Sequence, residues 1–159
     1  METLSIDVQT LRRPSWSAEE TANAELVATF VHLLMNEHDF ASVRDRFRAS
    51  AYRQHNHAIR DGIDGVIDTV SGLVKRFPEY GYDVKHILAD DDVVIFHSHA
   101  TLRAKHRGDD RRGFNITDRW RLDGGEIVEH WDSIQPMDRF ARSYVLLTGG
   151  RVRNTNGTY

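Results

Sequence analysis

The change of hydrophobic period near Pro78 is the feature that most constrains the fold. Before this proline, apolar side chains recur every three or four residues over four turns, which predicts a long helix that the proline ends. The apolar positions are Ile63, Val66, Ile67, Val70, Leu73, Val74 and Phe77. After the proline, β-branched and aromatic residues predominate, which favours strands. Helices followed by strands predict an α+β fold.

Four strands are predicted after Pro78, separated by turns rich in Asp and Gly. The strands are Tyr82–Leu88, Val93–Lys105, Phe114–Leu122 and Glu126–Gln135. The turns are Asp90–Asp92, Gly108–Asp110 and Asp123–Gly125. Strands joined in this order form an antiparallel meander, which twists and curls. We expect helices on its concave side to enclose a conical cavity that admits a small molecule.

Two further helices are predicted before the long one. Ser17 and Glu20 have the spacing of a capping box, so a helix should begin there. Its apolar stripe comprises Leu26, Val27, Phe30, Val31, Leu33 and Leu34. A short helix is expected through Phe40, Val43 and Phe47, and then a short strand or extended segment at Tyr52–Asn56.

The chain is expected to be one domain with an extension at each end. Its 159 residues suit a single core, and they contain no internal repeat and no proline-rich linker. We assign residues 1–17 to an N-terminal extension, 18–137 to the folded domain and 138–159 to a C-terminal arm. The arm should include a short helix and be partly flexible, with disorder at its polar extreme end.

Composition narrows the classes of function. Cysteine is absent, which excludes thiolate nucleophiles and cysteine-ligated metals and fits a reducing compartment. The net charge of −3, with interleaved acids and bases, argues against a nucleic-acid partner. Residues 1–16 lack a secretory signal pattern, and no apolar run approaches the roughly 20 residues of a spanning helix, so we expect a cytoplasmic protein without membrane contact. Phosphate-loop, dinucleotide and nucleophile-elbow motifs are missing, which leaves acid–base chemistry.

His97 and His99 are candidate site residues in the second predicted strand. Strand side chains alternate, so both imidazoles point to the same face. They are catalytic, or they are surface or interface histidines held by neighbours. Metal ligation is a third interpretation, although no Glu follows at the spacing of a metal-binding cupin.

Asp118 is the candidate carboxylate of the third predicted strand. It shares a face with Ile116, Trp120 and Leu122, and this apolar set should point inward. Burial there would raise the pKa of Asp118 and make it a proton acceptor or donor near neutrality. Alternatively, it is paired for structural reasons with an arginine or a histidine.

The turn Asp123–Gly125 decides which residues of the last strand face Asp118. A two-residue turn puts Glu129 and Trp131 on that face. A three-residue turn with a bulge brings His130 and Asp132 there instead, and the two consecutive glycines favour this second outcome. Asp132 is then a pocket residue; otherwise it is a strand-end carboxylate that caps backbone amides.

A polar cluster precedes the long helix, and two tryptophans lie in the last two strands. Gln54, His55 and Asn56 either hydrogen-bond a ligand or satisfy turn amides, and the second role is commoner. Trp120 and Trp131 either wall a pocket for a planar substrate or belong to the core or a subunit interface.

Three segments resemble one known family. The run Asp118–Asp132, followed by Ile134–Pro136, resembles the C-terminal signature of SnoaL-like (polyketide cyclase-like) proteins of the NTF2-like superfamily, which contains Asp-Gly-Lys-Ile-Val-Glu-His-Trp-Asp. Tyr52–Asn56 is similar to the family's Tyr-x-Gln-His-Asn stretch, and Val94–His99 resembles its strand with paired histidines. The resemblance covers about Ala18–Met137 in order.

The resemblance implies a cone-shaped α+β barrel, a homodimer packed through the outer sheet face, and no metal or organic cofactor. In the polyketide cyclases of the family, the aspartate at the position of Asp132 is the acid–base of an intramolecular aldol closure, and the residue at the position of Asp118 lines the pocket. This chain has aspartate at 118 where the cyclase has histidine, and His57 where a proline commonly follows Gln-His-Asn. The cyclase mechanism therefore does not carry over whole.

The leading hypothesis is a cofactor-independent enzyme that abstracts a proton next to a carbonyl, as a cyclase, isomerase or dehydratase. Asp132 or Asp118 is the expected base, and His99 or His97 orients the substrate oxygen. The expected substrate contacts are His97, Gln54, His55, Asn56, Trp120 and His130. The rival is a non-catalytic small-molecule-binding or protein-interaction module on the same fold. Convergence of the aspartates and histidines in an open pocket would favour the enzyme.

Overall fold

The chain is described by a computed structural model that covers residues 4–48, 51–149 and 152–158. Its helices are α1 (Val8–Leu11), α2 (Ala18–Val31), η1 (His32–Glu37, π-helical), α3 (Phe40–Phe47), α4 (Ile63–Arg76), η2 (Ala104–His106, 3-10) and α5 (Arg139–Thr148). Its strands are β1 (Arg53–Gln54), β2 (Gly81–Asp90), β3 (Val93–Thr101), β4 (Phe114–Asp123) and β5 (Glu126–Pro136).

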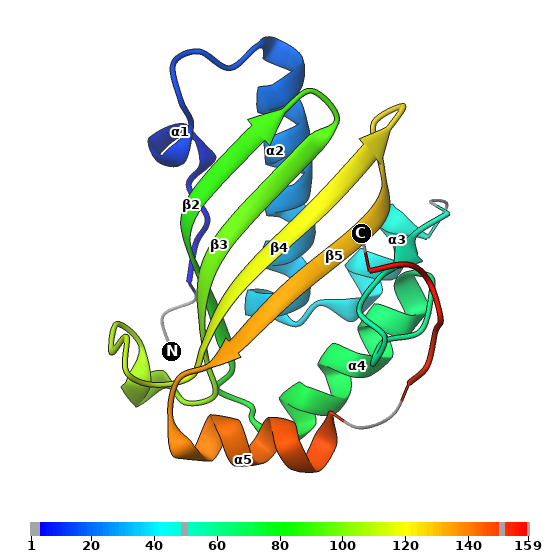
Figure 1. Cartoon of the computed structure of the whole chain (residues 1–159). Helices are drawn as coiled ribbons and strands as arrows, with labels where there is room; N and C mark the ends of the chain where they lie inside the picture. Colours follow the sequence, from blue (N-terminus) through cyan, green and yellow to red (C-terminus); the bar gives the residue numbers. More distant parts are fainter. Residues whose placement is uncertain (1–3, 49–50, 150–151, 159) are drawn as a thin grey trace.

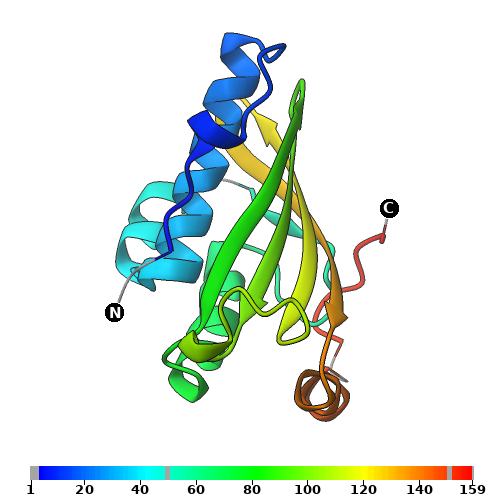
Figure 2. The ribbon, with the colours of Figure 1, turned by 90° about the vertical axis from the view of Figure 1, so that its left-hand side faces the viewer.

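The strands form one curved sheet in the order β1-β5-β4-β3-β2. β1 runs parallel to β5, and the other neighbouring strands are antiparallel. Helices α2, α3 and α4 cover one face of the sheet, and α5 lies across the end where β5 terminates (Figures 1 and 2). We call the helix-covered face the inner face and the opposite one the outer face. The predicted α+β fold, with helices on a curved and mainly antiparallel sheet, is confirmed; the sheet is open between its edges β1 and β2.

The capping box at Ser17 is present. The Glu20 amide donates to Ser17 Oγ at 3.1 Å, and the Ser17 amide donates to Glu20 Oε2 at 2.6 Å. The helix that begins there continues into η1, which ends at His38 in a left-handed conformation with φ 58°. Its buried stripe packs on the sheet and comprises Val27, Phe30, Val31 and Leu34.

The helix predicted before Pro78 is α4, and its buried face comprises Ile63, Val66, Ile67 and Val70. It ends at Arg76, before the proline, as expected. The prediction that β3 extends to Lys105 is wrong, because the strand ends at Thr101. The following residues, 103–112, are mostly charged and lack alternating apolar positions, so they form a loop with a single 3-10 turn.

The turn between β4 and β5 has two residues. Gly124 and Gly125 have φ values of 56° and 80°, and Asp123 pairs with Glu126. The register then shifts, because Leu122 pairs with Ile127 and Arg121 pairs with Glu129. Val128 is therefore an extra residue, a β-bulge in β5. The favoured three-residue turn is therefore wrong, but the predicted facing of His130 and Asp132 is confirmed, because the bulge lies in β5 beyond the turn.

The C-terminal arm begins with α5, whose N-cap Asp138 accepts a hydrogen bond from the Ala141 amide at 2.8 Å. Residues 152–158 have no regular secondary structure and lie against the segment after β1. The predicted disorder at the extreme end falls partly on Tyr159, which is outside the described residues. Within the described part of the chain, no helix combines the length and the apolar character needed to cross a bilayer.

Candidate active site

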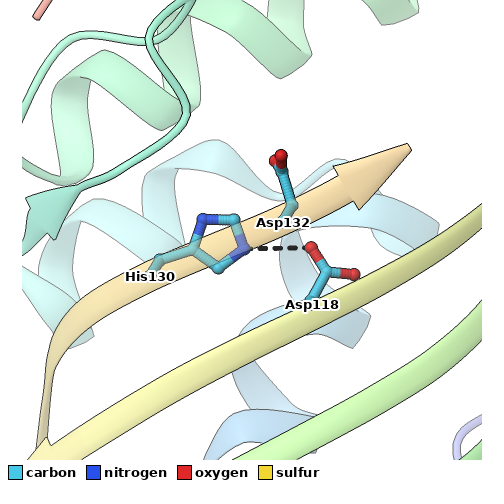
Figure 3. A group of neighbouring side chains, drawn as sticks. All are labelled: Asp118, His130 and Asp132. Carbon is cyan, nitrogen blue, oxygen red and sulfur yellow. Dashed lines mark hydrogen bonds and ion pairs between the residues drawn. The ribbon is translucent and has the colours of Figure 1, made fainter. Parts of the chain in front are cut away.

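Asp118, His130 and Asp132 converge on the inner face of the sheet (Figure 3). Asp118 on β4 pairs directly with Asp132 on β5, and the next inward pair is Trp120 with His130. Cross-strand partners share one face, so the strand register brings these side chains together. One carboxylate or imidazole atom from each of the three residues lies within 4.8 Å of the others.

Asp118 and His130 form a buried pair. His130 Nε2 lies 2.9 Å from Asp118 Oδ1, and the two residues are 6% and 4% exposed. The Tyr82 hydroxyl donates to the other carboxylate oxygen, Oδ2. Both oxygens of Asp118 thus have a partner, as a buried carboxyl group requires.

Gln54 determines which nitrogen of His130 carries a fixed proton. The Asn56 amide donates to Gln54 Oε1 at 2.9 Å, which identifies that atom as the amide oxygen. The oxygen accepts, so His130 Nδ1, 3.0 Å away, is a donor. Nε2 is consequently the nitrogen that shares a proton with Asp118. The pair can hold this proton on either member.

Asp132 is held by Asn56. The Asn56 side-chain amide donates to both carboxylate oxygens at 2.8 Å. Asn56 Oδ1 accepts from the Ala58 amide at 2.9 Å, which fixes the orientation of the side chain. Burial raises the pKa of the Asp132 carboxyl; nearby His130 lowers it, the charge of Asp118 raises it, and the Asn56 hydrogen bond lowers it.

Aromatic rings enclose His130. The Tyr52 ring lies 6.1 Å from the imidazole with an interplanar angle of 23°, and the Trp120 ring lies 5.1 Å away at 32°. Burial raises the pKa of Tyr52 and Tyr82 well above that of a free phenol, and the charge of Asp118 raises it further. Both phenols therefore stay protonated at neutral pH, and Tyr82 donates its proton to the hydrogen bond with Asp118.

His97 and His99 do not join this cluster. Phe96 pairs with Asp118, so the even-numbered residues of β3 face inward and the two histidines face outward. His97 Nε2 donates to Asn115 Oδ1 at 2.6 Å, and His99 Nε2 donates to the Arg112 carbonyl at 2.7 Å. The expectation that His99 or His97 orients a substrate oxygen beside Asp132 or Asp118 is wrong in this geometry.

The polar cluster before α4 is divided between the two faces. Gln54 and Asn56 contact the inner residues His130 and Asp132, as described above. His55 points to the outer face, where its ring stacks on Trp131 with centroids 4.3 Å apart. The Arg119 guanidinium lies 4.6 Å from the Trp131 centroid on the same face. His55 and Trp131 are thus separated by the sheet from Asp118.

Sequence reasoning missed Tyr82 and Tyr52. Tyr82 lies on β2, one strand beyond β3, and reaches Asp118 across the sheet. An inward-facing tyrosine at the start of a strand was the available signal, since a buried phenol seeks a polar partner. Tyr52 precedes a strand of only two residues, which offers no period from which to infer its orientation.

The cluster has the donor types of a divalent-cation site, carboxylate and imidazole. Each donor is nevertheless engaged by the protein: Asp118 with His130 and Tyr82, and Asp132 with Asn56. The arrangement is better suited to holding and moving a proton, because a partly buried carboxylate with a raised pKa, Asp132, lies beside a proton-sharing pair.

Helices on one face of an open, curved and mainly antiparallel sheet match the NTF2-like α+β fold. Within this class, the sequence model of the SnoaL-like domain matches residues 27–130. The chain therefore belongs to the SnoaL-like family.

Solved structures agree with this fold. "Putative polyketide cyclase" from Bacillus cereus ATCC 10987 aligns with a TM-score of 0.65 and 17% identity over 86% of this chain and 88% of its own. "Putative SnoaL-like polyketide cyclase" from Jannaschia sp. CCS1 aligns with a TM-score of 0.60 and 16% identity, over 87% of this chain and 100% of its own. An NTF2-like protein of unknown function from Cytophaga hutchinsonii ATCC 33406 aligns with a TM-score of 0.54 and 15% identity, over 72% of this chain and 90% of its own. No curated protein matches the sequence.

Proposed function

We propose that this protein catalyses cofactor-independent acid–base chemistry next to a carbonyl group of a small molecule. An aldol cyclisation, an isomerisation or a dehydration would each use the same first step. The observation that carries the proposal is Asp132, a partly buried carboxylate of raised pKa that lies beside the buried Asp118–His130 pair. Membership of a family whose relatives are named as polyketide cyclases supports a small-molecule substrate.

In this proposal Asp132 is the base. Its carboxylate takes a proton from the carbon next to the carbonyl, the C–H electron pair forms the enolate double bond, and the carbonyl π pair moves to oxygen. A protonated phenol such as Tyr52 can donate to that oxygen, because burial keeps it neutral. The enolate carbon then attacks a second carbonyl, is reprotonated elsewhere or expels a hydroxide, and no external oxidant or reductant is needed.

The Asp118–His130 pair holds the proton that such a reaction returns. His130 Nδ1 is committed to Gln54, so only the proton between Nε2 and Asp118 can be exchanged. Because Asp118 and Asp132 are opposite one another on paired strands, the two proton-carrying sites lie close together. We also propose a cytoplasmic homodimer, as the family resemblance implies; sedimentation velocity tests the dimer.

The deciding experiment replaces Asp132 with Asn. A thermal-shift screen of carbonyl metabolites first identifies a ligand, since a compound that binds only the folded state raises its stability. Asp132→Asn should then lower kcat by roughly 100-fold to 10,000-fold, the contribution of a positioned base. Asp123→Asn, at the exposed end of β4, is the matched control. Undiminished turnover by Asp132→Asn overturns the proposal, and a ligand that binds without being turned over supports a binding module.

A further inference from the structure

Residues 152–158 of the C-terminal arm lie along the segment that runs from Gln54, the last residue of β1, through Asn56 to the start of α4 (Figure 1). We call residues 54–61 the site loop. β1 is only two residues long, so the site loop has little ladder support of its own. Its contacts with the arm join residues about 100 positions apart in sequence.

Asn154 holds the part of the site loop that carries Asn56. Its side-chain amide donates to the Asn56 carbonyl at 2.9 Å and to the Ile59 carbonyl at 2.7 Å. An amide group with two protons can serve two carbonyls at once. The residue thus fixes the backbone from which Asn56 reaches both oxygens of Asp132.

Asn156 holds Gln54 in the same way. Its side-chain amide donates to the Gln54 carbonyl at 2.7 Å and to Asp61 Oδ1 at 2.8 Å. Asp61 Oδ1 also accepts from the Gln54 amide at 2.7 Å. Both backbone groups of Gln54 are therefore tied, one directly and one through Asp61, to the arm.

The backbone of the arm is fastened to two histidines of the site loop. His57 Nε2 donates to the Asn156 carbonyl at 2.9 Å, and the Arg153 amide donates to the His57 carbonyl at 2.6 Å. His55 Nδ1 donates to the Gly157 carbonyl. These bonds run in both directions between the segments, so neither can shift along the other without breaking several of them.

We propose that the C-terminal arm is a strap that positions the active site, and that Asn154 and Asn156 are its positioning residues. Two parallel routes connect them with the cluster. Asn154 acts on Asp132 through Asn56, and Asn156 acts on His130 through Gln54. This inference rests on the proposed function for its effect on turnover, and it rests on geometry alone for its effect on the site loop.

Isosteric variants of the full chain test the strap. Asn154→Asp and Asn156→Asp keep the shape of the side chain but replace the amide donor with a carboxylate, and Asn156→Asp also places that carboxylate beside Asp61. Thr155→Ala, between them and exposed, is the matched control. Asn154→Ser, which retains one donor, should be intermediate.

The first measurement needs no substrate. Asn56 donates to the ionised Asp132, so loosening Asn56 should move the titration of the Asp132 carboxyl carbon, followed by NMR, to higher pH in Asn154→Asp. The other groups that act on Asp132 are His130 and Asp118, with Tyr52 nearby, and they are unchanged. The uncharged Asn154→Ser should shift the titration in the same direction, which separates the lost hydrogen bond from the charge of the new carboxylate. In Asn156→Asp, the Asn56 amide should exchange faster with solvent, because its acceptor is the Gln54 side chain.

The second measurement uses turnover. Misplacing Asp132 or His130 should lower kcat by roughly tenfold to 100-fold with a smaller change in KM. The strap proposal is overturned if both aspartate variants show the same Asp132 titration, the same Asn56 amide exchange rate and the same kcat as the wild type. If Asp132→Asn leaves turnover intact while Asn154→Asp still shifts the titration, the proposed function fails and the strap stands.

Discussion

Histidines lie on both faces of the sheet, and their surroundings differ. On the inner face, His130 is buried between two aromatic rings and meets a carboxylate. On the outer face, His97 meets an amide oxygen and the imidazole of His86, with Nδ1 atoms 3.3 Å apart. Burial beside a carboxylate distinguishes His130 from His97, whereas the spacing of histidines along a strand does not mark a place for proton chemistry.

The outer pair has a simple hydrogen-bond pattern. Asn115 donates from Nδ2 to Gln135 Oε1 at 3.2 Å, so its Oδ1 accepts from His97 Nε2. His97 Nδ1 lies 3.3 Å from His86 Nδ1, so one of these two nitrogens donates to the other. No carboxylate takes part in these hydrogen bonds.

The largest expected effect comes from breaking the inner pair. Asp118→Ala leaves His130 Nε2 and the Tyr82 hydroxyl buried without their acceptor, which should lower the free energy of unfolding by about 3–5 kcal/mol. Urea denaturation of the variant and the wild type measures this difference. A loss below about 1 kcal/mol would show that the pair is not the structural centre of the inner face.

A smaller loss is expected at Gln54. Gln54→Leu removes the acceptor of His130 Nδ1 and of the Asn56 amide, and should cost about 1–3 kcal/mol because the site is fully buried. The matched change on the outer face is Asn115→Leu, whose partner His97 is partly exposed and can turn to water. Urea denaturation measures the free energy of unfolding of both variants. Equal losses would show that the two faces of the sheet do not differ in how strongly they depend on these hydrogen bonds.

The elements of this fold were predictable because their periods are local. Applied to β4, the rule that the apolar alternate set points inward correctly placed Asp118 with Ile116 and Trp120. Applied to β3, the same rule gives Val94 and Phe96 as the inward set, and so turns His97 outward. The side-chain chemistry of a histidine carries no information about its face, whereas the apolar residues that alternate with it along the strand do.

Other parts of the site depend on contacts that no local pattern contains. Asp132 faces inward because of one extra residue in β5, Val128. The two glycines of the turn predicted the correct face, but the bulge lies at Val128 and not in the turn. The contacts of Asn154 and Asn156 with the site loop join segments that share no sequence period. Long-range hydrogen bonds of this kind appear only when the whole chain is folded.

The ionised Asp132 carboxylate, which is the form that acts as a base, should lower the free energy of unfolding. Its pKa is raised from an ordinary value of 3.8, so the unfolded chain ionises first and the native state is destabilised at pH above the folded pKa. Asp132→Asn should therefore be more stable than the wild type at pH 7. The gain in the free energy of unfolding should be smaller than the losses expected for Asp118→Ala and Gln54→Leu. The advantage should shrink as pH falls and vanish below about pH 4. Thermal unfolding across this pH range measures it, and a variant less stable at pH 7 would contradict it.

The smallest effect is expected on the outer face, at His97. His97→Ala removes a hydrogen-bonded imidazole whose partners, His86 and Asn115, can turn to solvent, so the free energy of unfolding should change by no more than about 1 kcal/mol. Turnover should equal that of wild type, because the sheet separates His97 from Asp132. Kinetics at several protein concentrations are decisive: a loss at every concentration would return His97 to the site, whereas a loss only on dilution would place it in a subunit interface.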